Sequence, residues 1–265
     1  MKQILPLLAF ALASGAFAQE LVTLPTRPGV TQSFFIASMS GGKPEAAALL
    51  LIGGGGNIRL RVEDGQIKFG DRNFLPRSRR EFIRNGVVPV ILDNPSDKQA
   101  GDGMSDDFRE SAAHATDIRA VIGEVKKRYP GLPVFLVGTS RSTLSVAHLA
   151  RFLQSEVAGV VLSSSYFYTG GGTRARPVLV GFNWSAIRVP LLFVHHEDDS
   201  CGATPYREAA RLGRSFPLIT VRGGKPPESG PCDPLAPHGF FGREAETVDA
   251  IAGWMLGKPF AKEIQ

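Results

Sequence analysis

Three side chains that could carry out acyl chemistry are spread over the second half of the sequence. Ser140 lies in VFLVGTSRST, where an apolar run leads into Gly138 and Ser142 follows two residues later. A hydroxyl is a weak nucleophile at its ordinary pKa and needs a neighbouring base to take its proton. His238, in APHGFF, is an imidazole suited to that task, and an aspartate after PLLFVHH would orient it. The order Ser, Asp, His predicts a nucleophilic triad.

Each of these residues also has a structural interpretation. A serine at this place can cap the N-terminus of a helix, and a loop aspartate is often a turn residue. Two adjacent aspartates, Asp198 and Asp199, follow the apolar run, and either one is a candidate for the acid. The three residue types in this order favour the catalytic interpretation.

A glycine run supplies candidate donors for a developing oxyanion. Gly53–Gly56 directly follow the apolar run AALLLI, so backbone N–H groups there can approach a substrate without obstruction by side chains. We expect Gly54 and Gly55 to contribute one donor and the N–H of Arg141, next to Ser140, to contribute the other. Phosphate binding is disfavoured because no Gly-Lys-Ser/Thr sequence follows the glycines.

The elements that must position these residues alternate along the chain. Short apolar runs typical of strands covered on both faces are separated by amphipathic stretches, which is typical of βα units. The pattern predicts an α/β fold, with a mainly parallel sheet of about seven or eight strands and helices on both faces. The expected strands are residues 33–38, 47–53, 87–93, 134–138, 157–164, 190–196 and 217–223, and helical spacing occurs at 118–125, 144–152 and 248–255.

The chain resembles the α/β-hydrolase family over residues 30 to 260. The resemblance lies in Gly138, Ser140, the acid after LLFVHH, His238 and the glycine loop. It implies hydrolysis of a carboxylic ester or related acyl bond of a small molecule through a serine acyl-enzyme, without a metal or cofactor. The same triad serves amidases and peptidases, so the sequence does not separate these activities.

Family spacing also bears on the acid and on the turn at Ser140. The family often has His-Gly-x-x-Asp after this strand, and counting from His195, with His196 in the glycine position, favours Asp199 over Asp198. Ser142 departs from the family, which usually has a second glycine there. This departure motivates an alternative hypothesis, a catalytically weak member that binds an envelope ligand or a protein partner.

The interval between the expected strands 157–164 and 190–196 is short, so the resemblance implies a minimal or absent cap domain. Tyr166, Phe167 and Tyr168 in this interval either line an acyl pocket or belong to the core, and a turn is expected at 170–172. Alternating residues around Asp64-Gly65 predict a hairpin that overhangs the site.

The N-terminus predicts export. The pattern of a cleavable signal peptide covers residues 1–18, with Lys2, an apolar run and small residues up to Ala18. A single domain is expected at 19–265. We expect the protein to be exported to the bacterial periplasm or secreted. In such an oxidising compartment Cys201 and Cys232 predict a disulfide that ties the acid loop to the histidine loop. No later apolar segment is long enough to predict stable membrane insertion.

The charge pattern argues against a nucleic-acid partner. The chain of 265 residues has a formal net charge of +5, and its basic residues are spread out apart from the arginines at 77–80. A helical apolar pattern follows this cluster, so we interpret it as a solvated helix face. The sequence leaves protein partners unknown.

Overall fold

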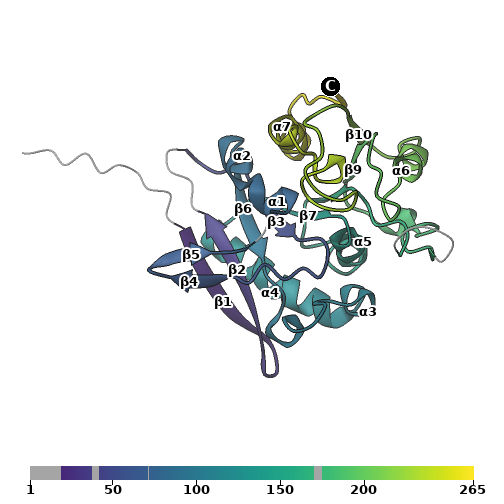
Figure 1. Ribbon diagram of the computed structural model, residues 1–265. Coiled ribbons are helices and arrows are strands. Elements are labelled where there is room, and N and C mark those ends of the chain that lie inside the picture. Colours follow the sequence, from purple (N-terminus) through teal and green to yellow (C-terminus); the bar gives the residue numbers. More distant parts are fainter. Residues whose placement is uncertain (1–18, 38–41, 71, 170–174) are drawn as a thin grey trace, which may run out of the picture.

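The structure, a computed structural model, describes residues 19–37, 42–70, 72–169 and 175–265 (Figure 1). The signal peptide expected at 1–18 and the turn expected at 170–172 lie outside the described residues. Among the described residues no helix is long and apolar enough to cross a membrane.

The centre of the molecule is a nine-stranded sheet in the order β1-β2-β6-β3-β7-β8-β9-β10-β11. The pairs β1–β2 and β2–β6 are antiparallel, and all pairs from β6 to β11 are parallel. The strands are β1 (Gln19–Arg27), β2 (Val30–Ala37), β3 (Ala46–Leu51), β6 (Val87–Leu92), β7 (Val134–Thr139), β8 (Gly159–Ser163), β9 (Leu191–His196), β10 (Leu218–Val221) and β11 (Glu263–Ile264).

All seven strands expected from the sequence are present, and the mainly parallel α/β sheet is confirmed. The expected count of seven or eight is corrected to nine because two edge strands are added. β1 is an edge strand whose residues are mostly exposed or half-buried, so its apolar pattern is weak. It also contains Pro25, which has no N–H to donate to a neighbouring strand and is tolerated at an edge. β11 has only two residues and pairs with β10 through Thr220 and Val221.

Helices cover both faces of the sheet, as predicted. One face is covered by α4 and α5 and the other by α2 and α7, whose apolar residues belong to two separate buried clusters. The helices are α1 (Phe74–Arg77), α2 (Arg79–Arg84), α3 (Asp106–Arg109), α4 (Ala112–Arg128), α5 (Ser142–Phe152), α6 (Tyr206–Leu212) and α7 (Glu244–Met255), with short 3-10 turns η1 (Ser96–Lys98), η2 (Trp184–Ala186) and η3 (Pro237–Gly239).

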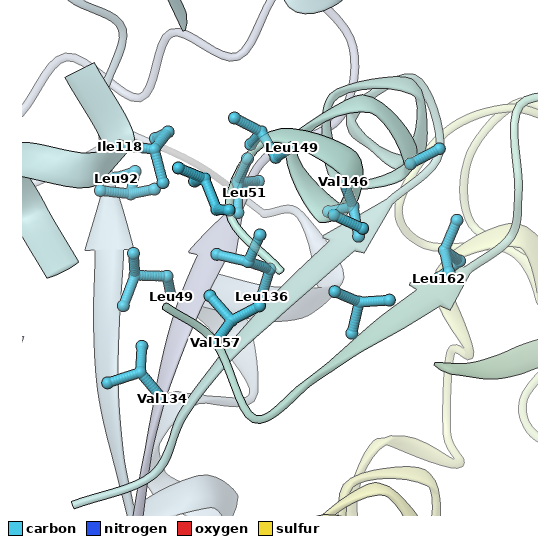
Figure 2. Close-up of a cluster of buried hydrophobic side chains, with 14 of the residues drawn as sticks. Leu49, Leu51, Leu92, Ile118, Val134, Leu136, Val146, Leu149, Val157 and Leu162 are labelled. Atoms are coloured by element: carbon cyan, nitrogen blue, oxygen red, sulfur yellow. The ribbon is translucent and has the colours of Figure 1, made fainter. Parts of the chain in front are cut away.

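The central strand β3 shows how the apolar pattern builds both layers. Its residues alternate between the faces, so that Leu49 and Leu51 enter one cluster while Leu50 enters the other. Figure 2 shows the first cluster, with residues of β3, β6, β7 and β8 beneath Ile118 of α4 and Leu149 of α5. Each fully buried leucine contributes roughly 1.5–3 kcal/mol relative to an exposed one. The strands beneath the site are therefore fixed from both sides.

The topology brings the candidate residues to one edge of the sheet. Because β3, β7, β8 and β9 are parallel neighbours, their carboxyl ends lie side by side, and ligands bind beyond such ends. The glycine run follows β3, Ser140 follows β7 and Asp199 follows β9, while His238 lies in η3 before α7.

The predicted hairpin is present, as the antiparallel pair β4 (Arg61–Glu63) and β5 (Gln66–Lys68) with Asp64 and Gly65 at its tip. It contacts β1, next to which it is drawn in Figure 1. Arg59, just before β4, reaches the cavity described below, whereas the two hairpin strands do not line it. The expected overhang is thus limited to the base of the hairpin.

Candidate active site

Ser140 lies on a tight turn between β7 and α5. Its φ angle is +55°, a left-handed conformation that costs a non-glycine residue roughly 1–2 kcal/mol. The Ser140 N–H donates to the carbonyl of Ser163 on β8 over 2.9 Å, and its own carbonyl accepts the N–H of Thr143 over 2.9 Å. The turn is thus anchored on both sides, and the Ser140 side chain is placed beyond the end of the sheet.

The turn requires small residues on its inner side. A Cβ at Gly138 would lie 2.7 Å from Cγ2 of Val146 and 2.9 Å from the carbonyl oxygen of Ser142. A Cβ at Gly53 would lie 2.9 Å from Cβ of Ser140. All three distances are too short for a real Cβ atom, so these glycines allow β3, β7 and α5 to approach one another.

Ser142, which stands where a second glycine is usual, fits the turn. Its side chain is fully buried; Oγ accepts the N–H of Thr139 over 2.9 Å and donates to the carbonyl of Leu51 over 2.7 Å. The hydroxyl therefore joins β3 to β7 beneath Ser140. The concern that a side chain here would disturb the turn is not supported by this geometry.

We expect Ser142→Ala to lower the free energy of unfolding by about 1–3 kcal/mol, because it leaves buried backbone groups without their hydroxyl partner. Chemical denaturation measures this change. The turn itself should persist, so reaction of Ser140 with an active-site probe should stay close to that of the wild type. A variant as stable as the wild type would show that the two hydrogen bonds contribute little.

Asp199 and His238 form a buried pair. Oδ2 of Asp199 lies 3.0 Å from Nδ1 of His238, and the exposed fractions of the two side chains are 0% and 6%. An ionised carboxylate only accepts hydrogen bonds, so this contact favours the tautomer in which Nδ1 donates and Nε2 can accept a proton. The exposed Asp198 uses its backbone N–H to donate to Nδ1 of His196. The structure therefore pairs His238 with Asp199 rather than with Asp198.

Thr204 completes this pair, although no sequence motif singled it out. Its Oγ1 donates to Oδ2 of Asp199 over 2.8 Å and lies 3.1 Å from Nδ1 of His238. The other carboxylate oxygen, Oδ1, accepts the N–H of Cys201 over 3.0 Å. The carboxylate is thus held at both oxygens, and the plane of the imidazole is fixed. A hydroxyl five residues after the aspartate is the only sequence signal for this role.

The expected disulfide is present between Cys201 and Cys232. Cys201 is two residues from Asp199, and Cys232 is six residues before His238. The covalent bond therefore ties the loop that carries the acid to the loop that carries the imidazole.

The glycine run forms a compact turn beside Ser140. Gly54 and Gly56 have φ angles of +58° and +84°, which glycine adopts without strain, and the Gly56 N–H donates to the Gly53 carbonyl over 3.0 Å. The Gly55 carbonyl accepts the side-chain amide of Asn94 over 2.9 Å and the N–H of Met104 over 3.0 Å. These bonds fix the loop that was expected to supply oxyanion donors.

These residues line one open cavity of about 730 Å³. Ser140, His238, Arg141 and the glycine run all contribute to its wall. In the described residues no hydrogen bond joins Ser140 to His238, although both face this space. The guanidinium of Arg141 is paired with Asp106 over 2.7 Å. The remaining wall is rich in polar side chains, namely Asn57, Arg59, Asn73, Gln99, Asp102 and Asp233.

The three aromatic residues considered for an acyl pocket lie elsewhere. Phe167 is 1% exposed and stacks on His195 with ring centroids 5.7 Å apart, so it is a core residue. The Tyr168 hydroxyl donates to Glu208 over 2.9 Å, and the Tyr166 N–H donates to Oγ1 of Thr143. None of the three lines the described cavity. Phe167 thus packs against β9, and Tyr168 is bonded to α6.

Burial keeps two other histidines, His195 and His114, in the neutral form. Burial lowers the pKa of His195 to about 3, and its Nε2 accepts the N–H of Ser165 over 2.7 Å. Burial, followed by the charge of Arg109, lowers the pKa of His114 to about 3 as well. Both rings are thus neutral at physiological pH. In the parts of the chain described, no group of three or more His, Cys, Asp and Glu residues is placed to hold a metal ion.

The described interval between β8 and β9 contains the isolated bridge between Tyr168 and Pro177 and the 3-10 turn η2. Over the residues described there, no α-helix stands above the cavity. This agrees with the expected minimal cap.

Comparison with solved structures defines the fold class. A soluble variant of monoglyceride lipase from Saccharomyces cerevisiae is similar with a TM-score of 0.62 at 12% identity, covering 94% of this chain and 98% of the lipase. Est1E from Butyrivibrio proteoclasticus has a TM-score of 0.59 at 13% identity, covering 89% of this chain and 98% of Est1E. The esterase domain of a Rhodothermus marinus protein has a TM-score of 0.58 at 14% identity, covering 91% of this chain and 99% of the esterase domain.

The chain has the α/β-hydrolase fold, as these similarities show. At such low identities the comparison defines the fold alone. No family model matches the sequence, and no curated protein matches it at a significant level.

Proposed function

We propose that this protein is a serine hydrolase that cleaves carboxylic esters, or related acyl bonds, of small polar molecules. The observation that carries the proposal is the buried Asp199–His238 pair, because His238 borders the same cavity as the strained Ser140. The strained turn, the glycine loop and the oriented imidazole supply the parts that acyl transfer requires.

The proposed reaction proceeds through two acyl transfers. Ser140 Oγ attacks the substrate carbonyl carbon while its proton moves to His238 Nε2, and the C–O bond to the leaving group breaks as that proton is delivered to the departing oxygen. Water then attacks the acyl-enzyme with the same imidazole as base, which releases the acid and restores the Ser140 hydroxyl. The contact between Ser140 and His238 closes when substrate is bound, since such contacts are often long in free enzymes.

Backbone donors stabilise the tetrahedral oxyanion in both steps. We assign these donors to the N–H groups of the Gly54–Gly55 segment and of Arg141. One such donor is worth about 10²–10³ in kcat in comparable enzymes. Asp199 holds the imidazole in the reactive tautomer and stabilises the imidazolium that forms.

The wall of the cavity supports a short acyl group and a polar substrate. Long acyl chains require extended apolar walls, whereas charged and amide side chains such as Arg59, Gln99 and Asp102 dominate this space. Among the neighbours, Est1E has been solved with ferulic acid bound, which is also a compact and partly polar molecule.

Hydrolysis of p-nitrophenyl esters of increasing chain length tests both parts of the proposal. We expect kcat/KM for acetate and butyrate to exceed that for decanoate by about tenfold or more, since the apolar chain gains little from a polar wall. Ser140→Ala should lose nearly all turnover while it keeps the wild-type circular dichroism spectrum. Full activity in this variant would remove Ser140 from its assigned role.

The alternative of a binding protein with weak catalysis loses its main support, because Ser142 is accommodated by hydrogen bonds rather than by distortion of the turn. We retain export as a proposal, with cleavage after Ala18 into the periplasm or the medium. The disulfide supports an oxidising compartment. Cell fractionation followed by mass spectrometry tests the cleavage. A recovered protein whose mass corresponds to a chain starting at Met1 would contradict it.

A further inference from the structure

A fully buried arginine connects the glycine loop to the helix that follows Ser140. Arg109 ends the four-residue helix α3 and is 0% exposed. Its Nη2 donates to the Gly54 carbonyl over 2.9 Å, and its Nη1 donates to Oγ of Ser145 on α5 over 3.1 Å. One guanidinium thus bridges the two segments to which we assign the oxyanion donors.

Arg109 has no ion-pair partner in the described part of the chain, and its buried Nε makes no hydrogen bond. Burial, with the charge of Arg141 acting in the same direction, lowers its pKa to about 9, so the group remains charged at neutral pH. By contrast, Arg27 bonds the carboxylates of Asp117 and Asp97. A buried cation without a carboxylate opposes folding, which points to a contribution to function.

The hydrogen bond to Gly54 sets the direction of a donor. The C=O and N–H of a trans peptide point in opposite directions, and no peptide bond described in this chain is cis. Because the Gly54 carbonyl faces Arg109, the Gly55 N–H of the same peptide group faces away from the guanidinium. Gly54 and Gly55 both border the cavity that contains Ser140. Arg109 therefore controls the orientation of this peptide group.

Neighbouring contacts also restrict rotation of the peptide groups in the Gly53–Gly56 loop. The next carbonyl, of Gly55, is held by Asn94 and Met104. A Cβ at Gly56 would lie 2.5 Å from Oδ1 of Asn94 and 3.2 Å from Nη2 of Arg109. The glycine at position 56 is thus required by the same contacts that hold the loop.

We propose that Arg109 is a positioning residue for acyl transfer. It holds the Gly54–Gly55 peptide so that the N–H stabilises the oxyanion, and its charge polarises that peptide and strengthens the donor. This inference rests on the proposed function, because it concerns the transition state of the same reaction.

The test compares Arg109→Met with the wild type on p-nitrophenyl acetate and on a phenylboronic acid, which forms a tetrahedral adduct with an active serine. We expect kcat to fall about 10- to 100-fold with KM changed less than about twofold, since the interaction is realised in the transition state. The affinity for the boronic acid should fall by the same factor as kcat/KM. A purely structural role would lower the melting temperature without this matched loss.

Arg27→Met is the matched control, because it also removes an arginine and leaves the buried Asp117 without its ion-pair partner, while the Thr26 hydroxyl still donates to that carboxylate. It should lower the melting temperature while kcat stays within about twofold of the wild type. If Arg109→Met does not fold, Arg109→Lys carries the test, with an intermediate loss expected because one cationic donor remains.

The outcomes separate the two proposals. Wild-type kcat and boronic acid affinity in the folded Arg109 variants would overturn this inference alone. A wild-type protein that neither hydrolyses esters nor reacts at Ser140 would overturn the proposed function, and this inference with it.

Discussion

Asp199→Asn is expected to lower kcat by about four orders of magnitude while the protein remains folded. The reason lies in the donors around the carboxylate. Oδ1 accepts the N–H of Cys201, which cannot reverse its role, so the amide oxygen of an asparagine must take that position. The amide NH₂ then faces His238, whose Nδ1 becomes an acceptor. The proton is thereby moved to Nε2, and the base is lost.

Asp198→Asn provides the matched control. Asp198 is exposed, and its backbone rather than its carboxylate contacts a neighbouring histidine. We expect kcat within about twofold of the wild type, as for surface substitutions away from a site. Steady-state kinetics of the two variants on the same ester makes the comparison. Equal losses in both variants, or no loss in Asp199→Asn, would contradict the assigned role of the acid.

Removal of the disulfide is expected to have the largest effect on stability. The bond joins residues separated by 31 positions, and closing such a loop stabilises the folded chain by about 3–4 kcal/mol in the chain-entropy model. The Cys201→Ala/Cys232→Ala variant should therefore lose that amount of unfolding free energy in chemical denaturation. Activity should also become more sensitive to temperature, because the acid and histidine loops are no longer joined.

Each single cysteine variant breaks the same bond, so its loss should equal that of the double variant rather than half of it. Alanine is chosen because Cys201 is 2% exposed and a serine hydroxyl would be buried there. A double variant with unchanged unfolding free energy would show that the native packing already fixes both loops.

The sequence contained enough information to predict that the candidate residues lie together, because the carboxyl ends of parallel strands meet at one edge. Ser140, Asp199 and His238 each lie just beyond an apolar run or just before an amphipathic helix, and the topology brings them together. The choice between Asp198 and Asp199 depends on which side chain is buried and points toward His238. Two adjacent aspartates in a sequence pattern do not reveal this. Family spacing favoured Asp199, and the contact with His238 agrees with it.

Other contacts around the candidate site could not be predicted from sequence patterns. Arg109 contacts Gly54 across 55 positions from a helix of four residues, too short to have a periodicity. Phe167 shows the converse problem, since an aromatic residue after a strand suits either a pocket or the core. Ser142 looked like a defect in the turn because a pattern records the side chain but not the backbone groups that it binds.

Labelling of the purified protein with a fluorophosphonate probe, followed by peptide mapping, tests the central claim most directly. We expect a covalent adduct on Ser140 that is lost in His238→Ala, because the phosphonate reacts only with a serine activated by a base. An unlabelled Ser140 in folded, oxidised protein, or equal labelling in the absence of the His238 imidazole, would contradict it.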